Sequence, residues 1–250
     1  MRILLSNDDG IKAEGLEALI HAFAPNHHVV VSAPMVQQSG MAHALTVRRS
    51  MEVERDLELE KQYGIEAWSV NGTPTDCVKL YLEALAEEKP NVVISGINHG
   101  ANLATDILYS GTVGAAMEGM LHDISSFAVS LDIESELSYD EVAYVFANYV
   151  ETIIRHAENK LFYNVNFPKA FCTEKPMFVF SRQGKRDYLN AFQREEREDG
   201  RIFYSVAGEI FDTDKSEPTD IYAVEAGYIS VTPLMTDLTD YMTLERSLDS

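Results

Sequence analysis

Two adjacent acids near the amino terminus are the residues whose type and position most directly indicate chemistry. Asp8 and Asp9 follow the apolar residues 3–5 and precede Gly10, so a short buried strand is predicted to end in two carboxylates. Ligands of open α/β sheets bind at the carboxyl ends of the strands, and neighbouring anions repel each other unless a positive charge lies between them. Because Mg²⁺ and Mn²⁺ prefer oxygen ligands, the pair predicts a divalent-cation site. The alternative is a polar turn in which one Asp caps the next helix.

A second polar segment, residues 95–114, contains a pattern that is typical of phosphate binding. Ser110, Gly111 and Thr112 directly precede a predicted helix. They offer free backbone N–H groups, two hydroxyls and the positive end of a helix dipole to a phosphate. The alternative is structural: Ser110 only caps the helix, and the small residues allow close packing.

Four more polar residues of the same segment are candidates for the site. Asn98 follows a predicted strand, so its side-chain oxygen could complete the metal site, or it could be a turn residue with a left-handed backbone. Asn102 and Asp106 could orient a phosphate or a water, or could hold the loop together. His99 could act as a general acid, although a single loop histidine often has no chemical role.

Strands and helices alternate over the first 168 residues, and this alternation predicts how the candidates come together. Strands are predicted near residues 1–5, 28–33, 91–95, 126–131 and 162–167, and helices near 16–23, 74–85, 112–120 and 142–154. Short runs at 43–47 and 67–70 are predicted to be strands of a less regular excursion, and 162–167 to be the last strand of the main sheet. The pattern indicates a doubly wound, mostly parallel, Rossmann-like sheet. Its carboxyl edge would carry the loops 7–10, 37–40 and 96–111.

The pattern changes after Pro168. Strands are predicted at residues 177–181, 201–206 and 228–232, joined by long charged loops without intervening helices. Strand pairs on such loops bury little surface alone. Residues 169–250 are therefore predicted to form an extension with hairpin strands and a carboxyl-terminal oligomerisation segment, and residues 1–168 the α/β core that carries the catalytic residues.

The composition limits the partners of the molecule. The chain has 250 residues, with 40 acidic and 20 basic side chains and a formal net charge of -20. Such a surface repels nucleic acid and anionic membranes, so neither is an expected partner. A phosphorylated substrate is repelled too unless a bound cation reverses the local field. Two cysteines outside any metal-ligand spacing, with no signal peptide and no membrane span, predict a cytoplasmic protein.

Several blocks of the sequence, taken in order, resemble one known family. The blocks are residues 7–11 (Asn-Asp-Asp-Gly-Ile), 39–40 (Ser-Gly), 71–78 (Asn-Gly-Thr-Pro-Thr-Asp-Cys-Val), 95–98 (Ser-Gly-Ile-Asn), 109–119 (Tyr-Ser-Gly-Thr-Val-Gly-Ala-Ala-Met-Glu-Gly) and 227–233 (Gly-Tyr-Ile-Ser-Val-Thr-Pro). Together they cover nearly the whole chain and are similar to the SurE family of survival-protein nucleotidases.

The resemblance implies a metal-dependent phosphatase that hydrolyses nucleoside 5′- and 3′-monophosphates and, in some members, short polyphosphate. It implies one divalent cation such as Mg²⁺ or Mn²⁺ per subunit and no other cofactor, and it implies assembly as a homodimer or homotetramer. Asp8 and Asp9 are the implied catalytic residues. The family's metal ligands correspond to Asp8, Asp9, Ser39 and Asn98. Its phosphate contacts correspond to Asn102, Ser110, Gly111 and Thr112.

Three positions depart from the pattern that is common in the family. Met35 replaces an acidic residue, Gln38 replaces Arg, and Ala104 replaces Gly. None of them is an implied metal ligand, so they bear on substrate preference and not on the type of reaction.

The expected reaction is attack of water on phosphorus in line with the leaving nucleoside oxygen. Three other readings compete with it. An aspartyl-phosphate phosphatase needs Asp-x-Asp, but Gly10 stands at the second acidic position. A Mg²⁺-binding phosphoacceptor module of a signalling protein needs an acceptor Asp where this chain has Asn98. A serine hydrolase at Ser110 lacks the Gly-x-Ser-x-Gly turn.

Overall fold

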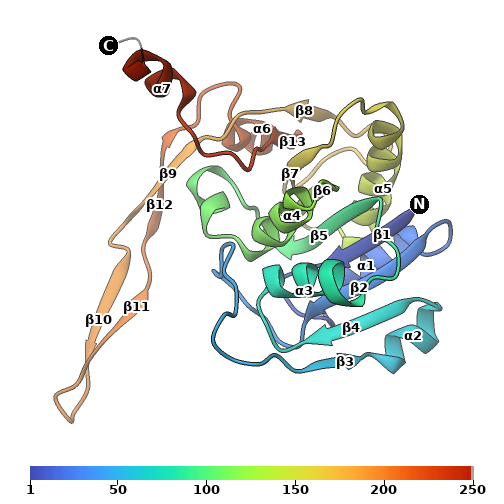
Figure 1. Cartoon of the computed structure of the whole chain (residues 1–250). Helices are drawn as coiled ribbons and strands as arrows, with labels where there is room; N and C mark the ends of the chain where they lie inside the picture. The colour runs from blue at the N-terminus through green and yellow to red at the C-terminus, as the bar shows by residue number, and fades with distance from the viewer. Residues whose placement is uncertain (249–250) are drawn as a thin grey trace.

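A nine-stranded sheet forms the centre of the computed structural model, which describes residues 1–248 (Figure 1). Its strands are β1 (Arg2–Ser6), β2 (His28–Pro34), β3 (Val53–Arg55), β4 (Glu66–Val70), β5 (Val92–His99), β6 (Ser125–Leu131), β7 (Phe162–Phe167), β8 (Phe178–Phe180) and β13 (Ile229–Pro233). They lie in the order β3-β4-β2-β1-β5-β6-β7-β13-β8. The strands from β4 through β7 in this order are parallel, whereas β3 and β13 pair antiparallel with β4 and β7. The predicted mostly parallel α/β sheet is confirmed.

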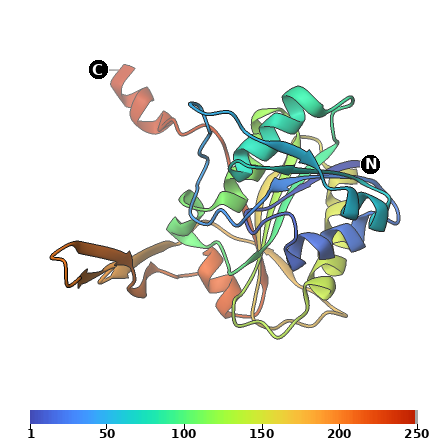
Figure 2. The same cartoon turned by 90° about the horizontal axis from the view of Figure 1, so that it is seen from below.

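Helices cover both faces of the sheet (Figure 2). One face carries α1 (Glu14–Phe23) and α5 (Tyr139–His156), and the other carries α3 (Pro74–Leu80), the π-helical turn η1 (Tyr81–Leu85) and α4 (Gly111–Leu121). Two short helices, α2 (Leu57–Tyr63) and the 3₁₀ helix η2 (Ala104–Leu108), lie in connecting segments. Within residues 1–248, no helix is long and apolar enough to cross a membrane.

The first strand shows why both faces are covered. Side chains of a strand point alternately to opposite faces, and Leu4 packs with Val78 and Tyr81 while Ile3 and Leu5 pack in the cluster that includes α1 and α5. Strand β1 lies between β2 and β5 and runs parallel to both. The loops that follow these three strands therefore leave the sheet at the same edge.

A long antiparallel ribbon projects from the body (Figures 1 and 2). Its root is formed by β9 (Lys185–Leu189) paired with β12 (Glu209–Asp214), and its tip by β10 (Phe192–Glu196) paired with β11 (Ile202–Val206). The predicted strand at 201–206 is thus confirmed as part of a hairpin. The terminal helix α7 (Tyr241–Leu248) also extends from the body and has no buried residue.

Four local predictions were wrong. Residues 67–70 lie in β4, which pairs in parallel with β2 inside the main sheet and is no excursion from it. Strands β13 and β8 extend the main sheet beyond β7, because Ile229 and Val231 are buried against its core. Residues 43–47 form no strand, since Thr46 donates its N–H and its hydroxyl to the carboxylate of Asp76. The region after residue 168 also contains a helix, α6 (Asp220–Glu225), which is capped by the Thr219 hydroxyl.

Candidate active site

Asp8 stands at the tip of β1 and is almost completely buried, with 6% of its surface exposed. Its Oδ1 accepts a hydrogen bond of 2.6 Å from the Thr112 hydroxyl. Burial is the main cause that raises the pKa of the Asp8 carboxyl to about 6, and the charge of Asp9 adds to it while the Thr112 hydrogen bond opposes it. A buried carboxylate beside a second acid is therefore a place where a cation would be strongly favoured.

Asp9 connects the tip of β1 with the two neighbouring loops. Its Oδ1 accepts from Nε2 of Gln37, in the loop after β2, at 3.1 Å, and its Oδ2 accepts from the backbone N–H of His99, at the end of β5, at 3.2 Å. The turn itself is held by Asn7, whose side chain donates to the Gly10 carbonyl and accepts from the Gly10 N–H. The carboxylate of Asp9 thus points toward both loops at this edge of the sheet.

A pocket of about 370 Å³ opens where these loops meet. It is lined by Asp8, Asp9, Gln37, Ser39, Gly40, Asn98, His99, Asn102, Asp106, Tyr109, Ser110 and Tyr188. Six of the eight predicted site residues are therefore brought together at one pocket. The other two, Gly111 and Thr112, lie directly behind it, where they contact Asp8.

The predicted metal ligands offer a set of hard oxygen atoms. Asn98 donates its side-chain N–H to the Gly100 carbonyl at 2.7 Å, which turns its amide oxygen toward other partners. Ser39 is exposed at the rim. Two carboxylates, an amide oxygen and a hydroxyl match the oxygen ligands that Mg²⁺ and Mn²⁺ take. Among residues 1–248 there is no group of three or more His, Cys, Asp and Glu side chains that could hold a metal, so a site here depends on the neutral oxygens.

The start of α4 is built for close approach to Asp8. A Cβ at Gly111 would lie 3.0 Å from Cβ and 3.1 Å from Oδ2 of Asp8, so a side chain here would crowd the carboxylate, and glycine lets the helix begin this near to it. Ser110 caps the helix by accepting from the Val113 N–H at 3.1 Å. The Thr112 hydroxyl donates its hydrogen bond to Asp8 and so orients this carboxylate. A phosphate in the pocket would therefore contact Ser110 and not the Thr112 hydroxyl.

Asn102 and His99 both line the pocket, but each has a structural partner. The Asn102 side chain donates to the Ser130 hydroxyl at 2.9 Å, and its backbone N–H donates to Asn166 of β7 at 2.8 Å. The His99 ring lies 3.0 Å from the Tyr139 hydroxyl, measured from Nδ1. These contacts fix the two residues at the rim of the pocket.

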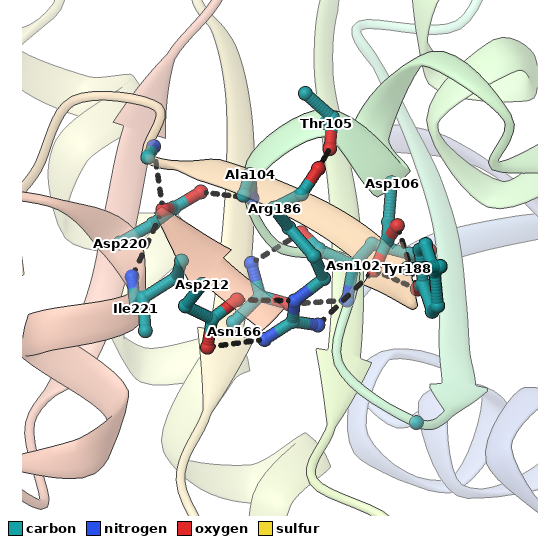
Figure 3. A network of polar contacts seen from close by, with 12 residues as sticks. Asn102, Ala104, Thr105, Asp106, Asn166, Arg186, Tyr188, Asp212, Asp220 and Ile221 are labelled. Carbon is teal, nitrogen blue, oxygen red and sulfur yellow. Dashed lines mark hydrogen bonds and ion pairs between the residues drawn. The ribbon is translucent and has the colours of Figure 1, made fainter. Parts of the chain in front are cut away.

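Tyr188 of the ribbon root also lines the pocket, and it belongs to a polar network around Asp106 that the sequence analysis missed (Figure 3). Tyr188 donates its hydroxyl to both Asp106 oxygens, at 2.8 and 2.9 Å, and Nη1 of Arg186 donates to the same carboxylate at 3.1 Å. Nε of Arg186 donates to Asp212 at 2.7 Å. Burial and the Asp106 contact raise the pKa of Tyr188 to about 12, so its hydroxyl stays protonated and donating. No sequence signal pairs residue 106 with residues 80 positions later, because only the folded ribbon brings them together.

One family of known proteins matches most of the chain. The family model described as "Survival protein SurE" matches residues 3–190 of this chain. The chain belongs to the SurE family.

Relatives within the SurE family align with nearly the whole chain. One is the 5′-nucleotidase SurE of Pelotomaculum thermopropionicum, which is 42% identical over 249 residues, covering 98% of this chain and 93% of that protein. Another is the 5′-nucleotidase SurE of Heliobacterium modesticaldum, 42% identical over 250 residues, with 100% and 91% covered. The crystal structure of the SurE protein from Aquifex aeolicus has a TM-score of 0.81 at 37% identity and covers all of both chains.

One departure from the SurE pattern has a structural explanation. Ala104 has a positive φ of 53°, a backbone conformation that glycine adopts without steric cost, which agrees with the glycine that the family resemblance leads us to expect here. Its N–H donates to Asp220 at 2.8 Å, and the other Asp220 oxygen accepts from the Gly184 N–H at 2.9 Å. This buried carboxylate therefore ties the loop that carries Ala104 to Gly184.

Proposed function

We propose that this chain is a metal-dependent phosphomonoesterase that hydrolyses nucleoside 5′-monophosphates, and also 3′-monophosphates and short polyphosphate. The observation that carries the proposal is the convergence of the Asp8–Asp9 pair, the loops after β2 and β5, and the start of α4 on one pocket. Membership of the SurE family and the 5′-nucleotidase names of its relatives support it.

We assign the metal to Asp8, Asp9, Ser39 and Asn98, with one divalent cation per subunit. When bound, such a cation polarises a phosphoryl oxygen and makes a bound water more acidic. The need for a cation follows from the charge of the molecule, because a net charge of -20 and two acids in the pocket would otherwise repel the substrate.

The residues of the chain supply the rest of the proposed mechanism. The backbone N–H groups at the start of α4, Ser110 and Asn102 hold the phosphoryl oxygens. The Thr112 hydroxyl holds Asp8 in place. Asp8 or Asp9 takes the proton of the water that attacks phosphorus. The bond from phosphorus to the nucleoside oxygen breaks on the opposite side, and this oxygen takes a proton from solvent water.

Phosphate release from a substrate panel tests the function. We expect purified protein to release phosphate from nucleoside 5′-monophosphates in Mg²⁺, Mn²⁺ or Co²⁺, with a smaller rate on 3′-monophosphates and short polyphosphate. Excess chelator should lower the rate at least about 100-fold, since the Lewis acid and the activated water are lost together. Equal rates with metal and with chelator would refute the metal dependence, and the absence of nucleotide hydrolysis in every metal would refute the activity.

We further propose that the ribbon pairs with a second copy of this chain, giving a homodimer or homotetramer of cytoplasmic protein. A two-stranded ribbon is marginally stable alone, and its tip exposes Phe192 (66%) and Val206 (86%), which pair across the strands. This assigns assembly to residues 169–250 and leaves the metal ligands in residues 1–168. Both cysteines are free, which agrees with a reducing compartment.

Sedimentation velocity tests the assembly. We expect the wild-type protein to sediment as a dimer or larger, and the variant Phe192→Ser with Val206→Ser to shift toward the monomer. Gln193→Ser on the opposite face of the same strand is the control and should keep the assembly. A monomeric wild-type protein at micromolar concentration would contradict the proposal.

A further inference from the structure

The segment that carries Ser39 has no regular secondary structure and needs anchors from elsewhere. Ser39 and Gly40 are exposed. Before them, the Gln38 N–H donates to the Asp8 carbonyl at 2.7 Å, and after them the Ala42 N–H donates to the Tyr109 carbonyl at 3.0 Å. The position of the Ser39 hydroxyl therefore depends on how firmly the chain is held on both sides.

A buried carboxylate on α4 holds the downstream side. Nε2 of His43 lies 2.8 Å from Oε2 of Glu118, whose side chain is only 3% exposed. The other Glu118 oxygen accepts from Nζ of Lys79 at 3.1 Å and lies 3.5 Å from Nδ1 of His122. Burial opposes ionisation, but the hydrogen bonds from His43 and Lys79 lower the pKa of Glu118, so it is an anion at neutral pH.

The backbone of the segment also rests directly on α4. A Cβ at Gly114 would lie 2.1 Å from the Ala42 carbonyl oxygen, so the loop and the helix touch with no side chain between them. Helix α4 begins at the phosphate-binding turn and carries Glu118 two turns later. One rigid helix thus sets the position of both the predicted phosphate site and the loop of Ser39.

We propose that His43 and Glu118 are positioning residues that hold the Ser39 loop against α4 and thereby set the affinity of the site for a divalent cation. The inference rests on the proposed function, because it needs Ser39 to be a metal ligand. Neither residue touches the pocket, so both act through the loop. Partners that orient a ligand typically change metal affinity 10- to 100-fold when they are removed.

The test is the dissociation constant of Mn²⁺ from the full-length, metal-stripped protein, measured from the free Mn²⁺ signal by electron paramagnetic resonance. We expect His43→Leu to weaken binding about 10-fold. His43→Gln, which keeps a donor for Glu118, should restore most of the affinity. Glu118→Gln keeps the volume of the side chain and gives a second variant that weakens binding. His156→Leu, an exposed histidine at the end of α5, is the matched control and should bind normally.

A double-mutant cycle separates positioning from general damage. If His43 acts through Ser39, then Ser39→Ala with His43→Leu should bind Mn²⁺ no more weakly than Ser39→Ala alone. The inference would be overturned if the losses of Mn²⁺ affinity in Ser39→Ala and His43→Leu added up in the double variant. It would also be overturned if both His43→Leu and Glu118→Gln bound Mn²⁺ as the wild-type protein does. A wild-type protein that binds no Mn²⁺ would instead refute the proposed function, so the two failures are distinguishable.

Discussion

Asp9→Asn is expected to lower kcat/KM on nucleoside 5′-monophosphates about 1,000-fold, which corresponds to about 4 kcal/mol of transition-state stabilisation. The substitution removes one of two charges that would hold the cation while keeping the size of the side chain. The fold should persist, because the contacts of Asp9 lie at the rim of the pocket and not in the core. Steady-state phosphate release in saturating Mn²⁺ measures the effect.

The control for this experiment is Glu158→Gln, which removes one negative charge from an exposed position after α5. Its rate should equal that of the wild-type protein, since Glu158 does not line the pocket and salt screens the charge of an exposed side chain. A near-normal rate for Asp9→Asn in Mn²⁺ would show that this carboxylate does not hold the metal.

Asp8→Asn is expected to make the metal-free protein more stable at neutral pH while it also abolishes activity. Burial raises the pKa of Asp8 from 3.8 to about 6 in the folded state, so the folded protein carries an unfavourable charge above this pH. The shift corresponds to about 3 kcal/mol of lost stability above pH 6. Asn removes the charge and its oxygen can still accept from the Thr112 hydroxyl, so we expect a gain of about 2 kcal/mol.

The gain in stability of Asp8→Asn over the wild-type protein should grow as the pH rises. Between pH 3.8 and about 6 the folded wild-type protein binds more protons at Asp8 than the unfolded chain does, so its stability falls as the pH rises through this window. Urea unfolding in chelator should therefore show the largest advantage of the variant above pH 6 and almost none at pH 4. Added Mn²⁺ should stabilise the wild-type protein and not the variant. Equal unfolding midpoints at pH 7.5 in chelator would contradict the buried charge.

The core of the site could be predicted because it depends on local signals and on one rule of topology. Asp8 and Asp9 closely follow a strand that the apolar residues 3–5 predict clearly, and the alternation of strands and helices predicts a parallel sheet. In such a sheet all carboxyl ends lie at one edge, so the loop of Ser39 and the end of β5, which carries Asn98, had to meet the acids. The pocket at this edge is lined by all four.

Only the tertiary structure shows which partners the side chains of Thr112 and Thr46 contact, because these partners lie far away in the sequence. The sequence indicates a hydroxyl at Thr112, but only the distance between β1 and α4 shows that this hydroxyl binds Asp8. Residues 43–47 alternate like a strand, yet Thr46 finds its partner in Asp76 and the loop packs on α4.

The sequence by itself therefore determined the fold class, the paired acids and the edge at which the site lies, since these follow from residues close together in the chain. Only the tertiary structure brought Tyr188 and Arg186 of the ribbon to Asp106, and His43 to Glu118. Such contacts depend on where helices and strands that are far apart in the chain pack against one another. The packing energy comes from many residues of the core, so no short stretch of sequence indicates which side chains will meet.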